Sequence, residues 1–271
     1  MRRLLFFSIA LVVLSSCNEY QKVLKETDVK AKYDLAQRYY DEKDFKRANR
    51  LFEQIAPKYV GKPQGERVMF FHANSYFGIK DYNFAGYQFE RFLKSYPQSD
   101  KVMEASFLGA KSYFMLSPKY SLDQTDTDKA LQKLQNFINT YPDSEFMEEA
   151  NAMAKELTTK KERKAFEIGK QFNKISKFDL SFLKPAISAI DNFITENPGS
   201  IYTEEALFIK FEASTNYAMN SYETKQIERL ENAKAAYNTL MKNYPETKFK
   251  KDANNLLSNI EKELKLIGTS R

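Results

Sequence analysis

The 271-residue chain has one cysteine, one histidine and no tryptophan. A single cysteine excludes an internal disulfide, so the stability of the folded protein has to come from packing. One histidine and the lack of a glycine-rich phosphate loop leave no catalytic constellation to assemble. The histidine, His72, lies beside Ala73 in a helical pattern, where a packed and hydrogen-bonded role is expected. The sequence therefore predicts no enzyme, no cofactor, no metal site and no small-molecule substrate.

Charge of one sign and long apolar runs are also lacking. The formal net charge is +6, from 42 basic and 36 acidic residues. Basic and acidic residues are mixed along the chain and form no basic stripe, so nucleic acid is not a predicted partner. No apolar run after Cys17 approaches 18 residues, and no transmembrane helix is predicted. With 42% hydrophobic residues, the chain has enough apolar side chains for a real core.

The N-terminus has the layout of a bacterial secretory signal. Arg2 and Arg3 precede an apolar run at residues 4–14, which is too short to span a bilayer. The following Leu-Ser-Ser-Cys resembles the lipobox of bacterial lipoproteins, in which the chain is cut before an acylated cysteine. We expect residues 1–16 to be a signal peptide and Cys17 to carry a covalent lipid that anchors the protein to a membrane. The alternative is a plain signal peptide with a chance cysteine.

Glycine and proline are scarce, with 8 of each, and apolar residues recur at helical spacing. A segment repeats along the chain, with an alanine, large apolar residues four and seven positions later, and a proline at twelve. These offsets place the three side chains on one stripe of a helix. An earlier copy from Ala48 keeps the apolar pattern but has its proline at Pro57. The four regular copies start at Ala85, Ala130, Ala186 and Ala233.

A partner helix precedes each repeated helix. Ala36 lies twelve residues before Ala48, and Ala73 lies twelve residues before Ala85. This spacing resembles the tetratricopeptide repeat, in which two helices form a hairpin and successive hairpins stack. We expect an all-α fold, a superhelix of about five helix pairs with a C-terminal capping helix at residues 246–266. The predicted parts are a lipidated linker at 17–29, repeats 1–3 at 30–142, and repeats 4–5 with the capping helix at 143–271.

Three of the first helices share a stripe of aromatic, polar and aromatic residues. The stripe lies three residues before, one after and four after Ala36, Ala73 and Ala110. Such residues suit an extended peptide in a solenoid groove, because aromatic rings and amides contact side chains and backbone respectively. They equally suit the core between repeats, and the sequence leaves both roles open. The nine candidates are Tyr33, Gln37, Tyr40, Phe70, Asn74, Phe77, Phe107, Lys111 and Phe114.

The whole chain resembles the BamD family, outer-membrane lipoproteins of the β-barrel assembly machinery. The resemblance rests on CNEYQKVLK from Cys17, on KYDLAQRYYDEKDFKRANRLFEQI in the first repeat, and on the number of repeats. It implies a scaffold on the periplasmic face of the outer membrane. The N-terminal repeats would engage unfolded outer-membrane proteins, and the C-terminal repeats would hold a barrel-forming subunit of the BamA type. Candidates for the subunit surface are Arg229, Lys248, Lys250 and Lys251.

Two other classes of lipoprotein carry the same helices. One is a periplasmic tetratricopeptide protein that coordinates cell-envelope or division complexes, as in the Tol system. The other is a carbohydrate-binding lipoprotein of nutrient uptake, but those chains are about twice as long, and this one lacks the tryptophan that stacks on sugars.

Overall fold

The structure, a computed structural model, describes residues 19–269. The predicted signal peptide and Cys17 lie outside these residues. The described chain is helical, with no strand between residues 19 and 269, and the predicted all-α fold of tetratricopeptide type is confirmed. Residues 19–25 are helical. The later elements are α2 (Val29–Asp41), α3 (Phe45–Tyr59), α4 (Gly65–Gly78), α5 (Tyr82–Ser95), α6 (Val102–Leu116), α7 (Thr125–Thr140), α8 (Met147–Ser176), η1 (Leu180–Phe182), α9 (Leu183–Glu196), α10 (Thr203–Met219), α11 (Glu223–Asn243) and α12 (Lys250–Thr269).

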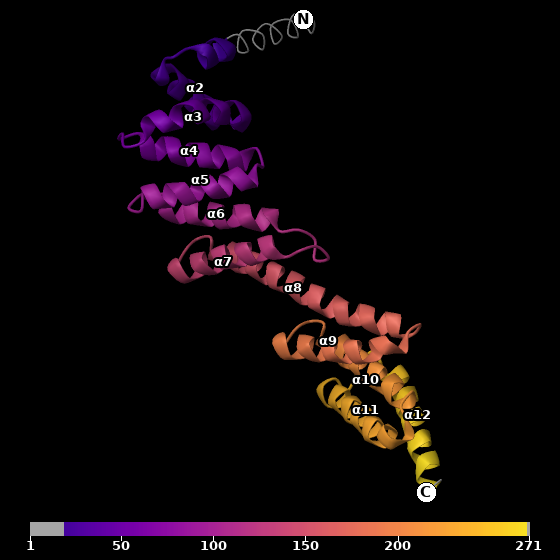
Figure 1. Ribbon diagram of the computed structural model, residues 1–271. Helices are drawn as coiled ribbons and strands as arrows, with labels where there is room; N and C mark the ends of the chain where they lie inside the picture. The colour runs from indigo at the N-terminus through magenta and orange to yellow at the C-terminus, as the bar shows by residue number, and fades with distance from the viewer. Residues whose placement is uncertain (1–18, 270–271) are drawn as a thin grey trace, which may run out of the picture. The chain divides into compact units, whose positions relative to one another are not determined.

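The chain divides into two compact units. The first contains α2 to α7 and the start of α8 as far as Leu157, and Figure 1 shows these helices as successive layers. The second contains the rest of α8, from Thr158, and α9 to α12, together with Lys119–Leu122 from the link between α6 and α7. The division thus falls inside α8, whereas the boundary expected from the sequence, after residue 142, precedes that helix.

The repeated alanine stripe forms the core of both units. All five starting alanines are fully buried, as are Phe92, Phe137 and Leu240 at the seventh position. A small side chain at the first position permits a neighbouring helix to approach closely, and the two large side chains fill the space beside it. The predicted core stripe is therefore confirmed.

The first two helix hairpins have the same turn. Lys43 and Lys80 adopt positive φ angles of 60° and 64°, which closes α2 and α4 in the left-handed conformation that commonly ends a helix. The next residue caps the following helix, because Asp44 accepts from the Arg47 amide and Asp81 accepts from the Phe84 amide. These two turns lie 37 residues apart, and the segments around them differ at most positions. Both nevertheless use a left-handed residue followed by an aspartate cap, as expected for a structural repeat.

A polar latch that the sequence analysis missed joins successive parts of the repeat at three junctions. A serine or threonine two residues after the proline caps the next helix through its hydroxyl oxygen, as Ser200 does for the Tyr202 amide. The same hydroxyl donates to a glutamate in the preceding hairpin, with Ser200 Oγ 2.8 Å from Glu162 Oε2. Two other junctions repeat this pair of contacts, at Ser99 with Glu66 and at Thr247 with Glu204.

The second unit ends on the helix that was predicted to cap it. Ala253 and Ile260 of α12 are fully buried in a cluster with Phe211 of α10 and Leu230 of α11. The helix begins at Lys250, four residues after the start expected from the sequence, because the Thr247 latch occupies the residues before it.

Gly78 lies where α4 packs closely against Phe45 of the first hairpin. A Cβ atom on Gly78 would clash with the Phe45 ring. We expect Gly78→Ala to lower the free energy of unfolding by about 1–3 kcal/mol, because a packed aromatic ring has to move. The matched control is Gly268→Ala, where a Cβ meets nothing within 4 Å and the change should stay within about 0.5 kcal/mol. Urea denaturation followed by circular dichroism measures both, and equal values would contradict the close approach.

Candidate binding surfaces

The centre of the candidate stripe is half-exposed. Gln37 on α2, Asn74 on α4 and Lys111 on α6 occupy equivalent positions in three consecutive hairpins, and each is partly accessible. The exposed Arg67 lies seven residues, or about two helical turns, before Asn74 and shares its face of α4. The structure thus brings together polar groups from α2, α4 and α6 on one face of the first unit.

Two of the aromatic candidates are core side chains. Phe70 is 4% exposed and Phe107 is 2% exposed. The reason is the capping serine before the next helix, since the second residue after that serine covers the phenylalanine of the preceding hairpin. Phe146 stacks on Phe107 with ring centroids 4.4 Å apart, and the Lys101 ammonium lies 5.5 Å from the centroid of Phe70. For Phe70 and Phe107, the structure selects the core role that the sequence left open.

The remaining aromatic candidates are half-buried between helices. Tyr33 packs against Tyr59, with centroids 5.7 Å apart, and Phe77 packs against Tyr82 at 5.5 Å. Phe114 packs on the edge of the third hairpin's core. These three side chains therefore contribute to the walls beside the polar centre.

Tyr40 joins the first two hairpins at that polar centre. Its ring stacks on Phe71 of α4, with centroids 4.2 Å apart and planes at 18°. The Asn74 side-chain amide donates to the Tyr40 hydroxyl at 2.6 Å. Burial raises the pKa of Tyr40 to about 12, so the hydroxyl keeps its proton and remains a donor at any physiological pH.

Lys111 is held over an aromatic ring by an acid of the next hairpin. Its ammonium lies 5.6 Å from the Phe107 centroid and 2.6 Å from Glu149 Oε1. The second unit repeats this arrangement, because Lys170 lies 5.5 Å from the Phe166 centroid and 2.7 Å from Glu205 Oε1. A partly exposed ion pair of this kind fixes the direction of a cation more than it stabilises the fold.

Arg229 lines a cavity of about 340 Å³ in the second unit, among α9, α10 and α11. Its guanidinium lies 4.2 Å from the Tyr217 centroid, and its Nη1 atom donates to Ser221 Oγ at 2.7 Å. These two contacts orient the guanidinium but satisfy only one of its five N–H donors, which leaves donors for an incoming acid.

The three candidate lysines lie elsewhere in the second unit, at the start of α12. Lys250 pairs with Glu246 at 3.1 Å, and Lys251 is exposed. The Lys248 ammonium lies 4.9 Å from the Phe249 centroid, and its backbone amide donates to Glu204. Arg229 and the lysines are therefore separate features and do not form one basic cluster.

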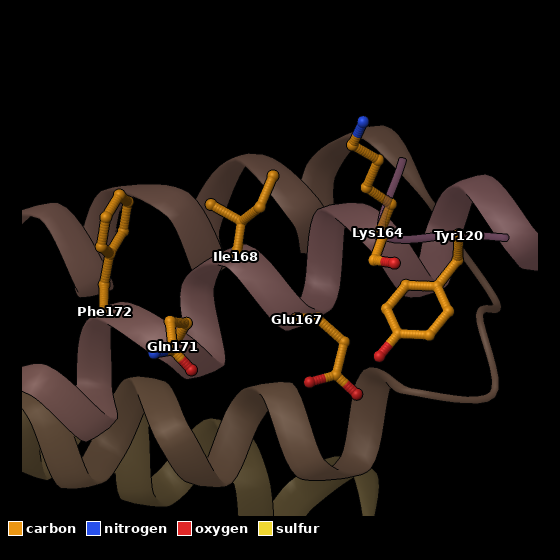
Figure 2. Close-up of a pocket in the computed structure, with 7 residues that line it drawn as sticks. Tyr120, Lys164, Glu167, Ile168, Gln171 and Phe172 are labelled. Carbon is orange, nitrogen blue, oxygen red and sulfur yellow. The ribbon is translucent and has the colours of Figure 1, made fainter. Parts of the chain in front are cut away.

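A third feature of the second unit was not singled out from the sequence. Residues 119–122 pack on α8, where Arg163 covers the Tyr120 ring at 4.1 Å and Lys164 Nζ donates to the Leu122 carbonyl at 2.7 Å. They enclose a cavity of about 390 Å³. Figure 2 shows Ile168 and Phe172 projecting from the same side of α8 along this cavity. Its only sequence signal is the i,i+4 spacing of two apolar residues on a polar helix.

His72 lines a larger cavity, of about 530 Å³, in the first unit. The imidazole is 5% exposed, and its Nε2 atom has no hydrogen-bond partner among the described residues. Burial and the nearby Arg91 guanidinium lower the pKa of His72 from 6.5 to about 4. The expected packed histidine is therefore buried as predicted, but it lacks the hydrogen bond at Nε2.

Two further searches concern the described residues alone. Within residues 19–269, His, Cys, Asp and Glu form no group of three or more that could hold a metal ion. None of the helices described there combines the length and the apolar character that crossing a bilayer requires.

Comparison with known families adds a relation that covers nearly all of the described chain. The YfiO family, whose description is outer membrane lipoprotein, matches residues 25–178 and 176–266. The chain belongs to the YfiO family of outer membrane lipoproteins. This membership supports the resemblance to BamD-type proteins and an association with the outer membrane. The matched residues contain both units and the candidate surfaces described above.

Other relatives add little. No curated protein matches the chain. A solved structure from work on the computational design of self-assembling cyclic protein homo-oligomers is 15% identical, with 98% of this chain and 97% of that chain covered and a TM-score of 0.22.

The buried His72 predicts a specific dependence of stability on pH. Because its folded-state pKa lies below the unfolded value, the unfolded chain binds more protons between pH 6.5 and about 4. The free energy of unfolding should therefore be highest above pH 6.5 and fall as the pH drops through that window. We expect the difference between the wild type and His72→Gln to shrink by about 2 kcal/mol between pH 7.5 and 4.5. Denaturation curves measured at both pH values test this, and parallel changes in the two proteins would contradict it.

Proposed function

We propose that the protein is a lipid-anchored scaffold of the outer-membrane β-barrel assembly machinery, on the periplasmic face of that membrane. The observation that carries the proposal is membership of the outer membrane lipoprotein family over both units. Stacked helix pairs support it, because solenoids present extended surfaces for protein partners. In this proposal the protein is not an enzyme and needs no cofactor other than the lipid on Cys17.

The proposed client site is the polar face of the first unit. Gln37, Asn74 and Lys111 lie at equivalent positions on α2, α4 and α6, and the Tyr40 hydroxyl adds a donor beside Asn74. Amides and a hydroxyl suit the backbone N–H and C=O groups of an extended chain, and Lys111 suits a carboxylate. Clients would be unfolded outer-membrane proteins, which present such backbone groups before their strands pair.

The proposed site for the barrel-forming subunit, a protein of the BamA type, is the cavity of the second unit that contains Arg229. Tyr217 and Ser221 hold its guanidinium in place, so little side-chain entropy is lost on binding an acidic side chain. Lys248, Lys250 and Lys251 form a second, exposed basic surface at the start of α12. There they would act at the rim of an interface, where charges chiefly raise the association rate.

Recovery of partners from the membrane tests the proposal as a whole. We expect the tagged, detergent-solubilised wild type to bring down a barrel protein with repeated periplasmic domains, identified by mass spectrometry. Arg229→Gln should reduce that recovery about tenfold, since it removes a charged hydrogen bond to an acid. Cys17→Ala should move the protein from the membrane to the soluble fraction, because the lipid is the proposed anchor.

The matched control for Arg229→Gln is Lys242→Gln, which removes an exposed charge from the same helix. Recovery of division or Tol-type proteins without a barrel protein would keep the lipoprotein and overturn the proposed machine.

Peptide binding tests the client site separately. The double variant Asn74→Ala, Lys111→Gln should bind a labelled peptide from an outer-membrane β-strand about tenfold more weakly, because each polar contact contributes about 0.5–1.5 kcal/mol. Fluorescence anisotropy measures the affinity, and circular dichroism verifies the fold. Lys46→Gln, at an exposed position on α3, is the control. Wild-type affinity in the double variant would remove the polar face as the client site.

A further inference from the structure

The cavity beside His72 lies on the opposite side of α4 from the proposed client face. Its α4 residues are Met69, His72 and Tyr76, whereas Arg67 and Asn74 belong to the client face. At 100° per residue, Asn74 and Tyr76 point about 160° apart around the helix axis. The remaining walls come from α3 and α5, so the cavity is built entirely within the first unit. It is therefore a separate site, and its role does not depend on the client surface.

Part of the cavity lining consists of large apolar side chains that are exposed to solvent. Phe84 is 53% exposed, and Val60 at the end of α3 is 60% exposed. Phe84 is ordered by stacking on Tyr76, with centroids 5.4 Å apart and planes at 20°. Met69 also lines the cavity and offers a polarisable thioether to an aromatic ring. This wall suits a flat apolar group.

The other wall carries a cation that has no acidic partner. The Arg91 guanidinium has two described contacts, a long hydrogen bond of 3.4 Å from Nη1 to Gln88 Oε1 and the Tyr87 ring, whose centroid lies 5.9 Å away. Among the residues that the structure describes, no carboxylate forms an ion pair with Arg91. The one acid on the cavity wall, Glu53, is already paired with Arg50 at 2.8 Å. The cavity thus has a net unpaired positive charge beside an apolar surface.

His72 of α4 also lines the cavity. The side chain is 5% exposed, and its buried Nε2 atom has no hydrogen-bond partner among the described residues. A neutral imidazole has one N–H donor, which can add to the donors of Arg91. At about 530 Å³, the cavity falls in the size range of small ligand sites, which are mostly apolar with a few converging polar groups.

We propose that this cavity binds a carboxylate carried on an apolar, aromatic body. The carboxylate lies against Arg91 and His72, and the aromatic group packs on Phe84 and Met69. Two sources share this chemistry, a free aromatic acid and an acidic residue next to an aromatic one in a polypeptide. The amphipathic character follows from the two walls, since neither a plain anion nor a plain hydrocarbon would use both.

The single histidine of the chain is a built-in reporter for the test. Its imidazole resonance, in full-length protein labelled with ¹³C-histidine, can be followed by NMR while N-acetyl-phenylalanine is added. We expect a saturable shift of that resonance. A bound carboxylate also favours the charged imidazole, so the titration midpoint of His72 should rise from about 4 when the probe is present. N-acetyl-phenylalaninamide, which has no carboxylate, should bind about tenfold more weakly or not at all.

Matched variants locate the site. Arg91→Gln should weaken binding of N-acetyl-phenylalanine about tenfold, while Arg67→Gln, on the client face of α4, should leave it unchanged. Both positions are exposed, and unchanged circular dichroism excludes unfolding as the cause. A third probe, the amide of N-acetyl-phenylalanyl-aspartate, separates the sources. Tighter binding than the free acid assigns the site to polypeptides, and weaker binding assigns it to small acids.

Three results would overturn the proposal. One is a His72 resonance that does not respond to either acidic probe. Another is equal binding of the acid and its amide, which would leave no role for Arg91. The last is loss of binding in Arg67→Gln with retention in Arg91→Gln, which would place the probe on the client face. None of these results bears on partner recovery or on the β-strand peptide.

Discussion

The close approach of two helices at an alanine is the contact on which the rest of the structure depends. Ala48 and Ala85 are fully buried, and each lets its helix lie near enough to its partner for Phe52 and Phe89 to fill the core beside it. A single hairpin cannot cover this apolar stripe, so burial is complete only when the next hairpin is added. Stability therefore accumulates along each unit, contact by contact, without a disulfide.

A capping hydroxyl determines how one hairpin meets the next. Ser144 caps the amide of Phe146, and that residue's ring then stacks on Phe107 of the preceding hairpin. The same sequence of contacts at Ser200 places Tyr202 on Phe166, with centroids 5.1 Å apart. The capping hydroxyl thus fixes the backbone at the start of the helix, and this backbone position places an aromatic ring on the phenylalanine of the preceding hairpin. Because this ring covers the phenylalanine, the accessible face of α2, α4 and α6 is formed by the polar residues Gln37, Asn74 and Lys111.

The sides of α4 have different surroundings for the same reason. The flank of α4 toward the next hairpin is core at Phe70, its centre is polar at Asn74, and its far side opens into the cavity at His72. One helix of 14 residues therefore contributes to the core, to the polar face and to the wall of the cavity. The buried histidine remains neutral above its pKa of about 4, so it adds no charge to the cavity over the physiological pH range.

The sequence alone determined the helical fold, the five hairpins and the buried alanine stripe, because these depend on periodicity and on side-chain size, which are local properties. It also located the polar residues Gln37, Asn74 and Lys111 on a shared face. Only the tertiary structure decided that Phe70 and Phe107 belong to the core, because the residues that cover them, Lys101 and Phe146, come from the next hairpin. The cavity between Arg91 and His72 was likewise invisible, since its walls meet only when α3, α4 and α5 pack together.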